Sequence, residues 1–226
     1  MIITIDGPAA SGKSTTAHMV SERSGMVYMD SGLMYRGVAL GFLKHNIEFS
    51  EYRASEFLPT LKLDAHCSDS IMKVFLESID VTSLLHSSKI TVVSSHIAKL
   101  RSVRDWLLKI QRGFGKKYGD DPGIIAVGRD MGTVVFRNAD HKFFVTASIE
   151  VRAQRRVDEL ELKGTTTSYQ EVHDAIAKRD YQDINRKIAP LKKASGATEI
   201  NTDLLTVDQQ VQMILDHIGT IKVDDS

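Results

Sequence analysis

The sequence predicts an α/β fold, in which a five-stranded parallel sheet is flanked by helices and carries a small antiparallel β insert and a helical lid. Three observations lead to this prediction. Five short apolar segments alternate with stretches of helical periodicity; they span residues 2–5, 26–29, 124–127, 141–145 and 197–200. A glycine-rich loop joins the first segment to a helix. Residues 61–66 instead alternate between apolar and polar positions, and two more short strand-like segments follow at 71–76 and 79–81, at the spacing of antiparallel hairpins.

Composition limits the classes of protein to which the chain can belong. Its 226 residues are enough for one domain with insertions. The 29 basic and 29 acidic residues balance, which argues against a nucleic-acid-binding protein built on bulk positive charge. The single cysteine, Cys67, can form neither an internal disulfide nor a thiolate metal cluster. The chain starts with its first strand, without room for a signal peptide, and has no apolar run of membrane-spanning length. We therefore expect a cytoplasmic protein that is a monomer by default.

The loop after the first strand fits the phosphate-binding pattern G-x-x-x-x-G-K-[ST]; it is Gly7-Pro8-Ala9-Ala10-Ser11-Gly12-Lys13-Ser14, with Thr15 behind it. Residues 14–24 are expected to form a helix that ends at Gly25. Gly7 and Gly12 let backbone N–H groups turn towards phosphate oxygens, and the helix start adds its partial positive charge. Lys13 can reach the outer phosphates, and the Ser14 hydroxyl can bind Mg²⁺. The loop predicts a nucleoside triphosphate site without identifying what receives the phosphate.

The second strand, 26–29, ends in a polar turn at Asp30-Ser31-Gly32, and a helix is expected over 33–45. In a doubly wound sheet, residues just past a strand's carboxyl end face the ligand crevice. Ser31 and Arg36 are therefore placed to meet a second substrate, and an arginine fork suits a phosphate group. From this segment alone, a solvated helix arginine fits Arg36 equally well.

The middle of the chain holds the insert and a long helical stretch. Residues 46–59 are expected to be helical in part, and three short strands follow, with polar turns at Ser68-Asp69-Ser70 and Glu77-Ser78. Residues 88–114 are expected to be mostly helical, because apolar residues recur there at steps of three and four. Ser95 and Arg104 lie in that stretch, and spacing alone gives them no role.

The strand at 124–127 ends in Gly128-Arg129-Asp130-Met131-Gly132-Thr133, again where the crevice should lie. Arg129 could hold a phosphate. Asp130 could accept from an exocyclic amine or a sugar hydroxyl, or could orient Arg129. A local ion pair is the alternative, but a functional role is favoured because polar residues follow three strand ends.

Two helical arms with arginines predict a hinged lid. Ser148 is the expected N-cap of the first arm, and Ser168 with Glu171 fits a capping box for the second, which Pro190 is expected to end. Arg152, Arg155 and Arg156 share one face of the first arm, and Arg155 is assigned to the ATP side. Arg179, Asp183 and Arg186 share a face of the second arm, where Asp183 can pair with both arginines. A solvated charged surface is the usual alternative, but a lid over phosphates would keep water out.

These parts together indicate phosphoryl transfer between two bound nucleotides or metabolites, which depends mainly on positioning and charge neutralisation. No dedicated general base is evident, and none is needed if the acceptor is an anionic phosphate oxygen. This favours a monophosphate acceptor over an alcohol such as shikimate. A regulatory nucleotide switch is less favoured, since the chain has no guanine-reading N/T-K-x-D element and no strand of the Walker B type.

The chain resembles the bacterial cytidylate kinases, of the nucleoside monophosphate kinase group. The resemblance covers nearly the whole sequence, and its most specific part is Gly128-Arg129-Asp130-Met131-Gly132-Thr133-Val134-Val135-Phe136. It also includes Ile5-Asp6-Gly7-Pro8, Asp30-Ser31-Gly32 with Tyr35-Arg36, Arg179-Asp180, Asp183, Asn185-Arg186 and Ala189-Pro190-Leu191. Two departures are Ala10, at a loop position often filled by glycine, and Tyr181-Gln182, where charged lid residues are common.

The resemblance implies ATP-dependent phosphorylation of CMP and dCMP, with roles for individual residues. Gly7 to Thr15 would hold ATP with Mg²⁺, and Arg36, Arg129 and Arg186 would surround the acceptor phosphate. Ser31, Ser95, Arg104 and Asp130 would read cytosine, while Arg179 and Asp183 would contact the ribose. Lys13, Arg129, Arg179 and Arg186 are the expected catalytic residues. The expected parts are a core at 1–58, 83–150 and 194–226, an insert at about 59–82 on the monophosphate side, and a lid at about 151–193.

Overall fold

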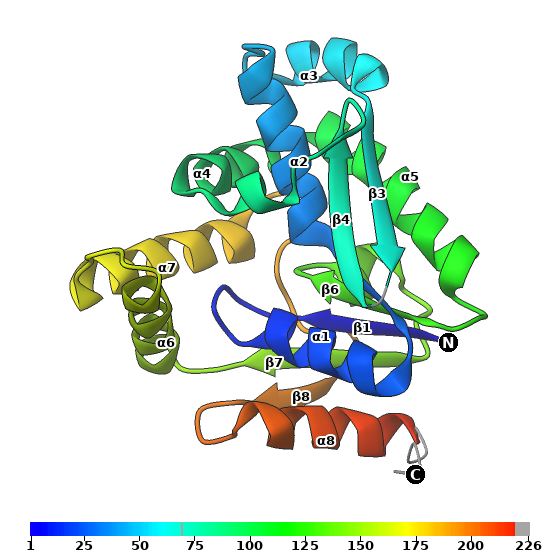
Figure 1. Ribbon diagram of the computed structural model, residues 1–226, viewed down its shortest axis with the longest axis vertical. Coiled ribbons are helices and arrows are strands. Elements are labelled where there is room, and N and C mark those ends of the chain that lie inside the picture. The colour runs from blue at the N-terminus through cyan, green and yellow to red at the C-terminus, as the bar shows by residue number, and fades with distance from the viewer. Residues whose placement is uncertain (69, 220–226) are drawn as a thin grey trace.

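The structure, a computed structural model, describes residues 1–68 and 70–219. Its main sheet has five parallel strands in the order β2-β6-β1-β7-β8 (Figure 1). The strands are β1 (Ile2–Asp6), β2 (Val27–Asp30), β6 (Ile124–Gly128), β7 (His141–Thr146) and β8 (Thr198–Asn201). This confirms the predicted strands, with boundaries shifted by one residue at most. The central strand β1 lies between β6 and β7, and Ile3 and Ile5 on it are fully buried.

The helices around this sheet follow the predicted pattern with two corrections. They are α1 (Lys13–Ser24), α2 (Ser31–Lys44), α4 (Ser88–Ile97), α5 (Arg101–Tyr118) and α8 (Val207–Ile218). The polar turn expected at Asp30-Ser31-Gly32 is instead the start of α2, since the Asp30 carboxylate caps the helix by accepting from Gly32 N at 2.8 Å. The stretch expected to be mostly helical between 88 and 114 is two helices that are separated at residues 98–100.

The insert forms the expected three-stranded antiparallel sheet: β3 (Leu63–Ser68), β4 (Ile71–Leu76) and β5 (Ile79–Asp80). A short helix, α3 (Glu51–Phe57), and the turn η1 (Leu58–Thr60) precede it, and η2 (Thr82–His86) follows it. The insert packs on α2 (Figure 1) at glycines: a Cβ on Gly37 would come within 2.8 Å of Leu63, and one on Gly41 within 2.7 Å of Leu61. The expected turn at Asp69 and the expected core residues 220–226 lie outside the described residues.

The lid helices are α6 (Ile149–Leu162) and α7 (Tyr169–Asn185), which extend together from one side of the molecule (Figure 1). Ser148 caps α6, and Ser168 with Glu171 forms a capping box on α7, as predicted. The prediction that α7 ends at Pro190 is wrong. The helix ends at Asn185, because the backbone of Arg186 has an extended conformation. The two helices have an apolar cluster of their own, which consists of Ala153, Val157, Val172 and Ile176.

None of the helices in the described ranges combines the length and the apolar character needed to cross a membrane.

Candidate active site

The phosphate loop lies between β1 and α1, and its backbone conformation explains its glycines. A Cβ on Gly7 would lie 2.0 Å from the Val145 carbonyl oxygen, so β7 leaves no room for a side chain there. Gly12 is the N-cap of α1 with φ 87°, a left-handed conformation that favours glycine. Ala10 keeps a left-handed backbone too, with φ 57°. Ala10 therefore holds a left-handed conformation that glycine would adopt more readily.

Carbonyl groups of the loop are held by partners from other parts of the fold. Arg152 Nη1 donates to the Ala9 oxygen at 3.0 Å, and the Thr202 hydroxyl donates to the Ser11 oxygen at 3.3 Å. A trans peptide points its C=O and the following N–H in opposite directions. The N–H groups of Ala10 and Gly12 thus point away from these anchors. Lys13 Nζ donates to another carbonyl of the loop, the Pro8 oxygen, at 2.8 Å.

Residues at the ends of β1 and β6 form the second part of the site. Buried Asp6, the last residue of β1, accepts from Met131 N at 2.9 Å and Gly132 N at 2.8 Å. These bonds fix η3 (Met131–Val135), a single π-helical turn, and with it the segment that carries Arg129 and Asp130. The Ser31 hydroxyl donates to the Val127 oxygen at 2.9 Å, so this predicted site residue is tied to the end of β6.

Four predicted site residues join the lid to this segment through ion pairs. Arg129 Nε donates to Asp183 Oδ2 at 2.9 Å, and Arg186 Nη1 lies 3.6 Å from Asp183 Oδ1. Arg186 Nη2 also lies 3.7 Å from Asp130 Oδ1. The expectation that Asp183 pairs with Arg179 and Arg186 is correct only for Arg186, since Arg129 takes the other place.

Asp130 is also bound to Arg104, and both side chains are buried. The guanidinium of Arg104 lies over the ring of Tyr35, 5.6 Å from its centroid. The possibility that Asp130 orients the neighbouring Arg129 is therefore wrong, because its ion-pair partners are Arg104 and Arg186. The pair of Arg104 and Asp130 offers donors and an acceptor side by side at the end of β6.

Positive charge is crowded between the loop and the lid. Burial lowers the pKa of Lys13 well below its usual range, and the charges of Arg129 and Arg179 lower it further. Burial and the nearby Arg129 likewise lower the pKa of Arg179 to about 10. Arg36 belongs to the same group, because burial and Arg129 lower its pKa while Asp30 opposes them. Such mutual repulsion is relieved when anions bind.

Some buried polar atoms of the site lack a hydrogen-bond partner within residues 1–68 and 70–219. They include the Ser11 hydroxyl of the loop, Arg179 Nε and Arg186 Nη2. Buried donors are nearly always satisfied in folded proteins, by protein groups, water or a ligand. The unsatisfied donors and the crowded cations together favour a site for phosphate groups.

The remaining predicted residues differ in how firmly the structure ties them to this site. Arg155 lies beside the loop: its guanidinium donates to Thr202, and Nη1 would be 4.0 Å from a Cβ on Gly12. Thr15 is exposed on α1. The Ser95 hydroxyl donates to the Thr91 oxygen on its own helix at 3.2 Å, and no hydrogen bond among the described residues joins it to the arginines.

Sequence reasoning gave no individual site role to three residues that the structure places in the site region: Asp30, Arg152 and Asp180. Asp30 Oδ2 is 3.5 Å from the Ser14 hydroxyl, and the strand-end rule that selected Ser31 applies equally to its neighbour. Arg152 and Asp180 form a buried pair beside Ala9. The spacing of charged residues along one helix cannot show that Arg152 of α6 meets Asp180 of α7.

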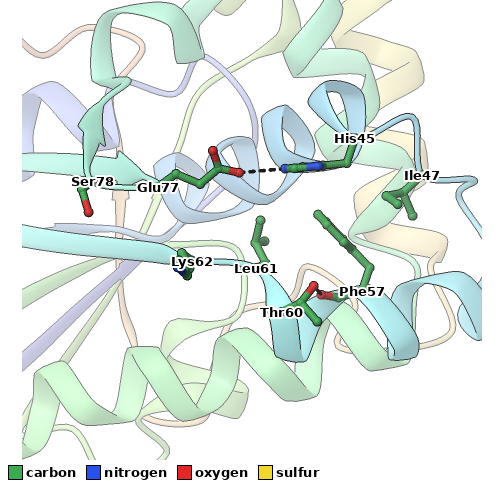
Figure 2. A pocket seen from close by; sticks show the side chains of 8 residues that line it. All are labelled: His45, Ile47, Phe57, Thr60, Leu61, Lys62, Glu77 and Ser78. Carbon is green, nitrogen blue, oxygen red and sulfur yellow. Dashed lines mark hydrogen bonds and ion pairs between the residues drawn. The ribbon is translucent and has the colours of Figure 1, made fainter.

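A surface pocket of about 550 Å³ lies elsewhere, between the end of α2 and the insert (Figure 2). In it His45 points towards Glu77, with 2.8 Å between Nε2 and Oε1. None of the predicted site residues lines this pocket. The described part of the chain also contains no group of three His, Cys, Asp or Glu residues able to hold a metal ion.

Comparisons of the sequence with known proteins agree on one family. The family described as cytidylate kinase matches residues 3–220. A cytidylate kinase of Salinibacter ruber is 42% identical over 219 residues, which are 96% of each chain. That of Bacillus subtilis is 38% identical over 217 residues, 96% of this chain and 95% of the other. An uncharacterized protein from Eubacterium ventriosum shares the fold, with a TM-score of 0.52, 12% identity, and 98% and 99% of the two chains covered.

Proposed function

This chain belongs to the cytidylate kinase family, and we propose that it transfers the γ-phosphoryl group of ATP directly to CMP or dCMP. The observation that carries the proposal is the group of cations between the phosphate loop and the lid. Lys13, Arg36 and Arg179 each have a pKa lowered by burial and by the charge of Arg129. A site with so much buried positive charge suits two phosphate-bearing molecules that meet there.

On the donor side, ATP would occupy the loop from Gly7 to Thr15. The inward N–H groups and the start of α1 would bind its phosphates, and the Lys13 ammonium would neutralise charge on the moving group. Arg155 would lie beside the nucleotide, since it already bridges the loop and the segment after β8 through Thr202.

Mg²⁺ would bind at Ser14, and the residues there fit it. The Ser14 hydroxyl is an oxygen ligand, and the Asp30 carboxylate lies 3.5 Å from it. Mg²⁺ bound to nucleotides takes one or two protein oxygens and completes its shell with phosphate oxygens and water. The lack of a larger carboxylate cluster in the described residues therefore agrees with this assignment. The ion would neutralise charge on the phosphates.

On the acceptor side, Arg36, Arg129 and Arg186 would surround the CMP phosphate, with Arg179 and Asp183 at the ribose. Ser31, Ser95, Arg104 and Asp130 would read the base. Cytosine presents a donor amine beside acceptor N3 and O2, so a carboxylate matches the amine and Arg104 matches the acceptors. Uracil would place a carbonyl against Asp130 and leave two buried acceptors facing each other, which polar sites reject strongly.

The proposed step is an in-line displacement. An anionic oxygen of CMP attacks the γ-phosphorus, the bond from that phosphorus to the β,γ-bridging oxygen breaks, and ADP leaves with the electron pair. The attacking oxygen carries no proton at neutral pH, so a general base is not required. Positioning and charge neutralisation by Lys13, Arg129, Arg179 and Arg186 supply the catalysis.

Stereochemistry and acceptor range test the finer parts of the proposal. The donor for the first test is ATPγS whose γ-phosphorus is made chiral with oxygen isotopes. An in-line transfer inverts the configuration at that phosphorus, whereas retention would show a phosphoenzyme intermediate. With dCMP as acceptor, formation of dCDP is expected. If dCMP gives no product while CMP does, the deoxynucleotide part of the proposal is wrong.

The expected partition into core, insert and lid remains a proposal as well, supported by the separate apolar cluster within α6 and α7. A monomeric state and a cytoplasmic location likewise stay predictions. Light scattering on the purified protein tests the first, and cell fractionation tests the second.

A further inference from the structure

A buried ion pair joins the two lid helices, and the proposed reaction uses neither member. Arg152 of α6 donates from Nη1 to Asp180 of α7, and both residues are buried. Arg152 Nε also donates to the Ala147 oxygen at 3.0 Å. Taking two charges out of water costs free energy that their attraction recovers only with good geometry and further hydrogen bonds. The additional partners of this pair therefore indicate what it does.

Those partners are the backbone groups of a single loop residue. Arg152 Nη1 donates to the Ala9 oxygen at 3.0 Å, and Ala9 N donates to Asp180 Oδ1 at 3.3 Å. Both polar backbone groups of Ala9 are thus bound by the lid. The next residue, Ala10, packs against the lid's apolar cluster. The lid holds the loop at two consecutive residues, one of which has the left-handed φ of 57°.

This contact sets the direction of the peptide between Ala9 and Ala10. The Ala9 carbonyl points to Arg152, and the planar trans peptide then points the Ala10 N–H the opposite way, away from the lid pair. We infer that Arg152 and Asp180 are positioning residues for ATP, which hold the Ala9–Ala10 peptide in the orientation that binds phosphate. The inference rests on the proposed role of the loop as the ATP site.

A paired substitution separates this role from simple stabilisation. Replacing only one partner leaves an unpaired buried charge and can unfold the protein, whereas Arg152→Met combined with Asp180→Leu removes both charges. We expect this double variant to melt close to the unmodified protein. Its dissociation constant for a non-hydrolysable ATP analogue should rise on the order of tenfold to a hundredfold. CMP affinity should change much less. An analogue affinity equal to that of the unmodified protein overturns the inference.

Two further variants complete the experiment. Arg53→Gln with Glu56→Gln removes an exposed pair on α3, outside the lid, and should leave analogue binding unchanged. Arg152→Lys keeps Asp180 paired, so it gives a folded protein even if the apolar double variant does not fold. Because a single ammonium cannot reproduce the guanidinium fork, it should raise the KM for ATP while keeping kcat at saturating ATP. An unchanged KM contradicts the inference.

The same binding assay tells the two proposals apart. If the unmodified protein does not bind the analogue, or if Lys13→Ala binds it equally well, the loop is not the ATP site and the proposed function fails. If Lys13→Ala loses binding and the Arg152/Asp180 double variant keeps it, only the inference about the pair fails.

Discussion

Arg129 Nε donates to Asp183 Oδ2 at 2.9 Å, and this bond joins the segment after β6 to the lid helix α7. Burial alone would raise the pKa of Asp183, but Arg129, Arg179 and Arg186 outweigh burial and hold it below its usual range. The carboxylate is therefore the negative centre of an otherwise positive site. Its position explains how several arginines can lie close together before a phosphate neutralises them.

Replacing Asp183 by asparagine should impair catalysis without removing the side chain's volume. Arg129 and Arg186 lose a charged partner, and a hydrogen bond to a charged group contributes about 1.5–3 kcal/mol. If the transition state loses this much stabilisation, kcat/KM for CMP falls roughly tenfold to a hundredfold. Asp174→Asn is the control, since Asp174 lies exposed on the same helix. Equal kinetics for the two variants would remove Asp183 from the site.

Asp130→Ala should reduce activity with CMP far more than Lys142→Ala does. Lys142 lies on β7, where its one hydrogen bond within the described residues goes to the Arg137 oxygen, whereas Asp130 is buried against Arg104 and Arg186. Removing one partner of a buried pair also destabilises a protein by about 3–5 kcal/mol. Rates should therefore be measured well below the melting temperature of each variant.

Asp130→Asn separates base recognition from stability. An amide offers a donor that a uracil carbonyl can accept, so the ratio of kcat/KM for CMP to that for UMP should fall. A lower melting temperature with an unchanged ratio would mean that Asp130 is structural only.

Gly7→Ala should destabilise the protein, because the added Cβ would lie 2.0 Å from a backbone oxygen of β7 that cannot move aside cheaply. Overpacking of this kind costs typically 1–3 kcal/mol. Gly113→Ala is the matched control, since no atom of the described residues, apart from adjacent residues and the backbone of its own helix, lies within 4 Å of its added Cβ. Gly113 lies inside α5, so alanine should stabilise the helix there by roughly 0.8–1 kcal/mol. Melting temperatures that move in the same direction would contradict this account of the loop.

Asp6 should make stability depend on pH. Burial raises its pKa from 3.8 to about 6, although two backbone N–H groups oppose the change. Between these values the folded state binds the proton more tightly than the unfolded state, so the stability due to Asp6 falls as the pH rises. The shift corresponds to roughly 3 kcal/mol.

Urea unfolding of the unmodified protein and of Asp6→Asn across this range provides the test. The stability of the unmodified protein relative to the variant should decrease from pH 3.8 to 6. A constant difference would show that the Asp6 carboxyl titrates normally in the folded protein.

Structural features that depend on neighbouring residues in the sequence could be predicted. The phosphate loop is contiguous, the buried strands are short apolar runs, and the Ser168–Glu171 capping box depends on a spacing of three residues. The positions of Arg129, Asp130 and Ser31 followed from the rule that strand ends meet at one edge of a parallel sheet.

The ion pairs that these side chains form could not be predicted from the sequence in the same way. Asp130 is adjacent to Arg129 in sequence, yet it binds Arg104, which is 26 positions away. That choice depends on how α5 lies against β6. The break between α4 and α5 also has no sequence signal, because residues 98–100 contain neither glycine nor proline. Likewise, only the packed lid shows that Arg152 and Asp180 meet at Ala9.

The acceptor of the phosphoryl group is the central claim, and an ADP-release assay tests it most directly. The purified protein, ATP and Mg²⁺ are combined with CMP, dCMP, UMP, AMP or shikimate in turn, and with no acceptor. The account predicts rapid ADP release with CMP, much slower release with UMP and AMP, and almost none with shikimate or without acceptor. A preference for AMP or shikimate, or equal turnover with and without CMP, would contradict it.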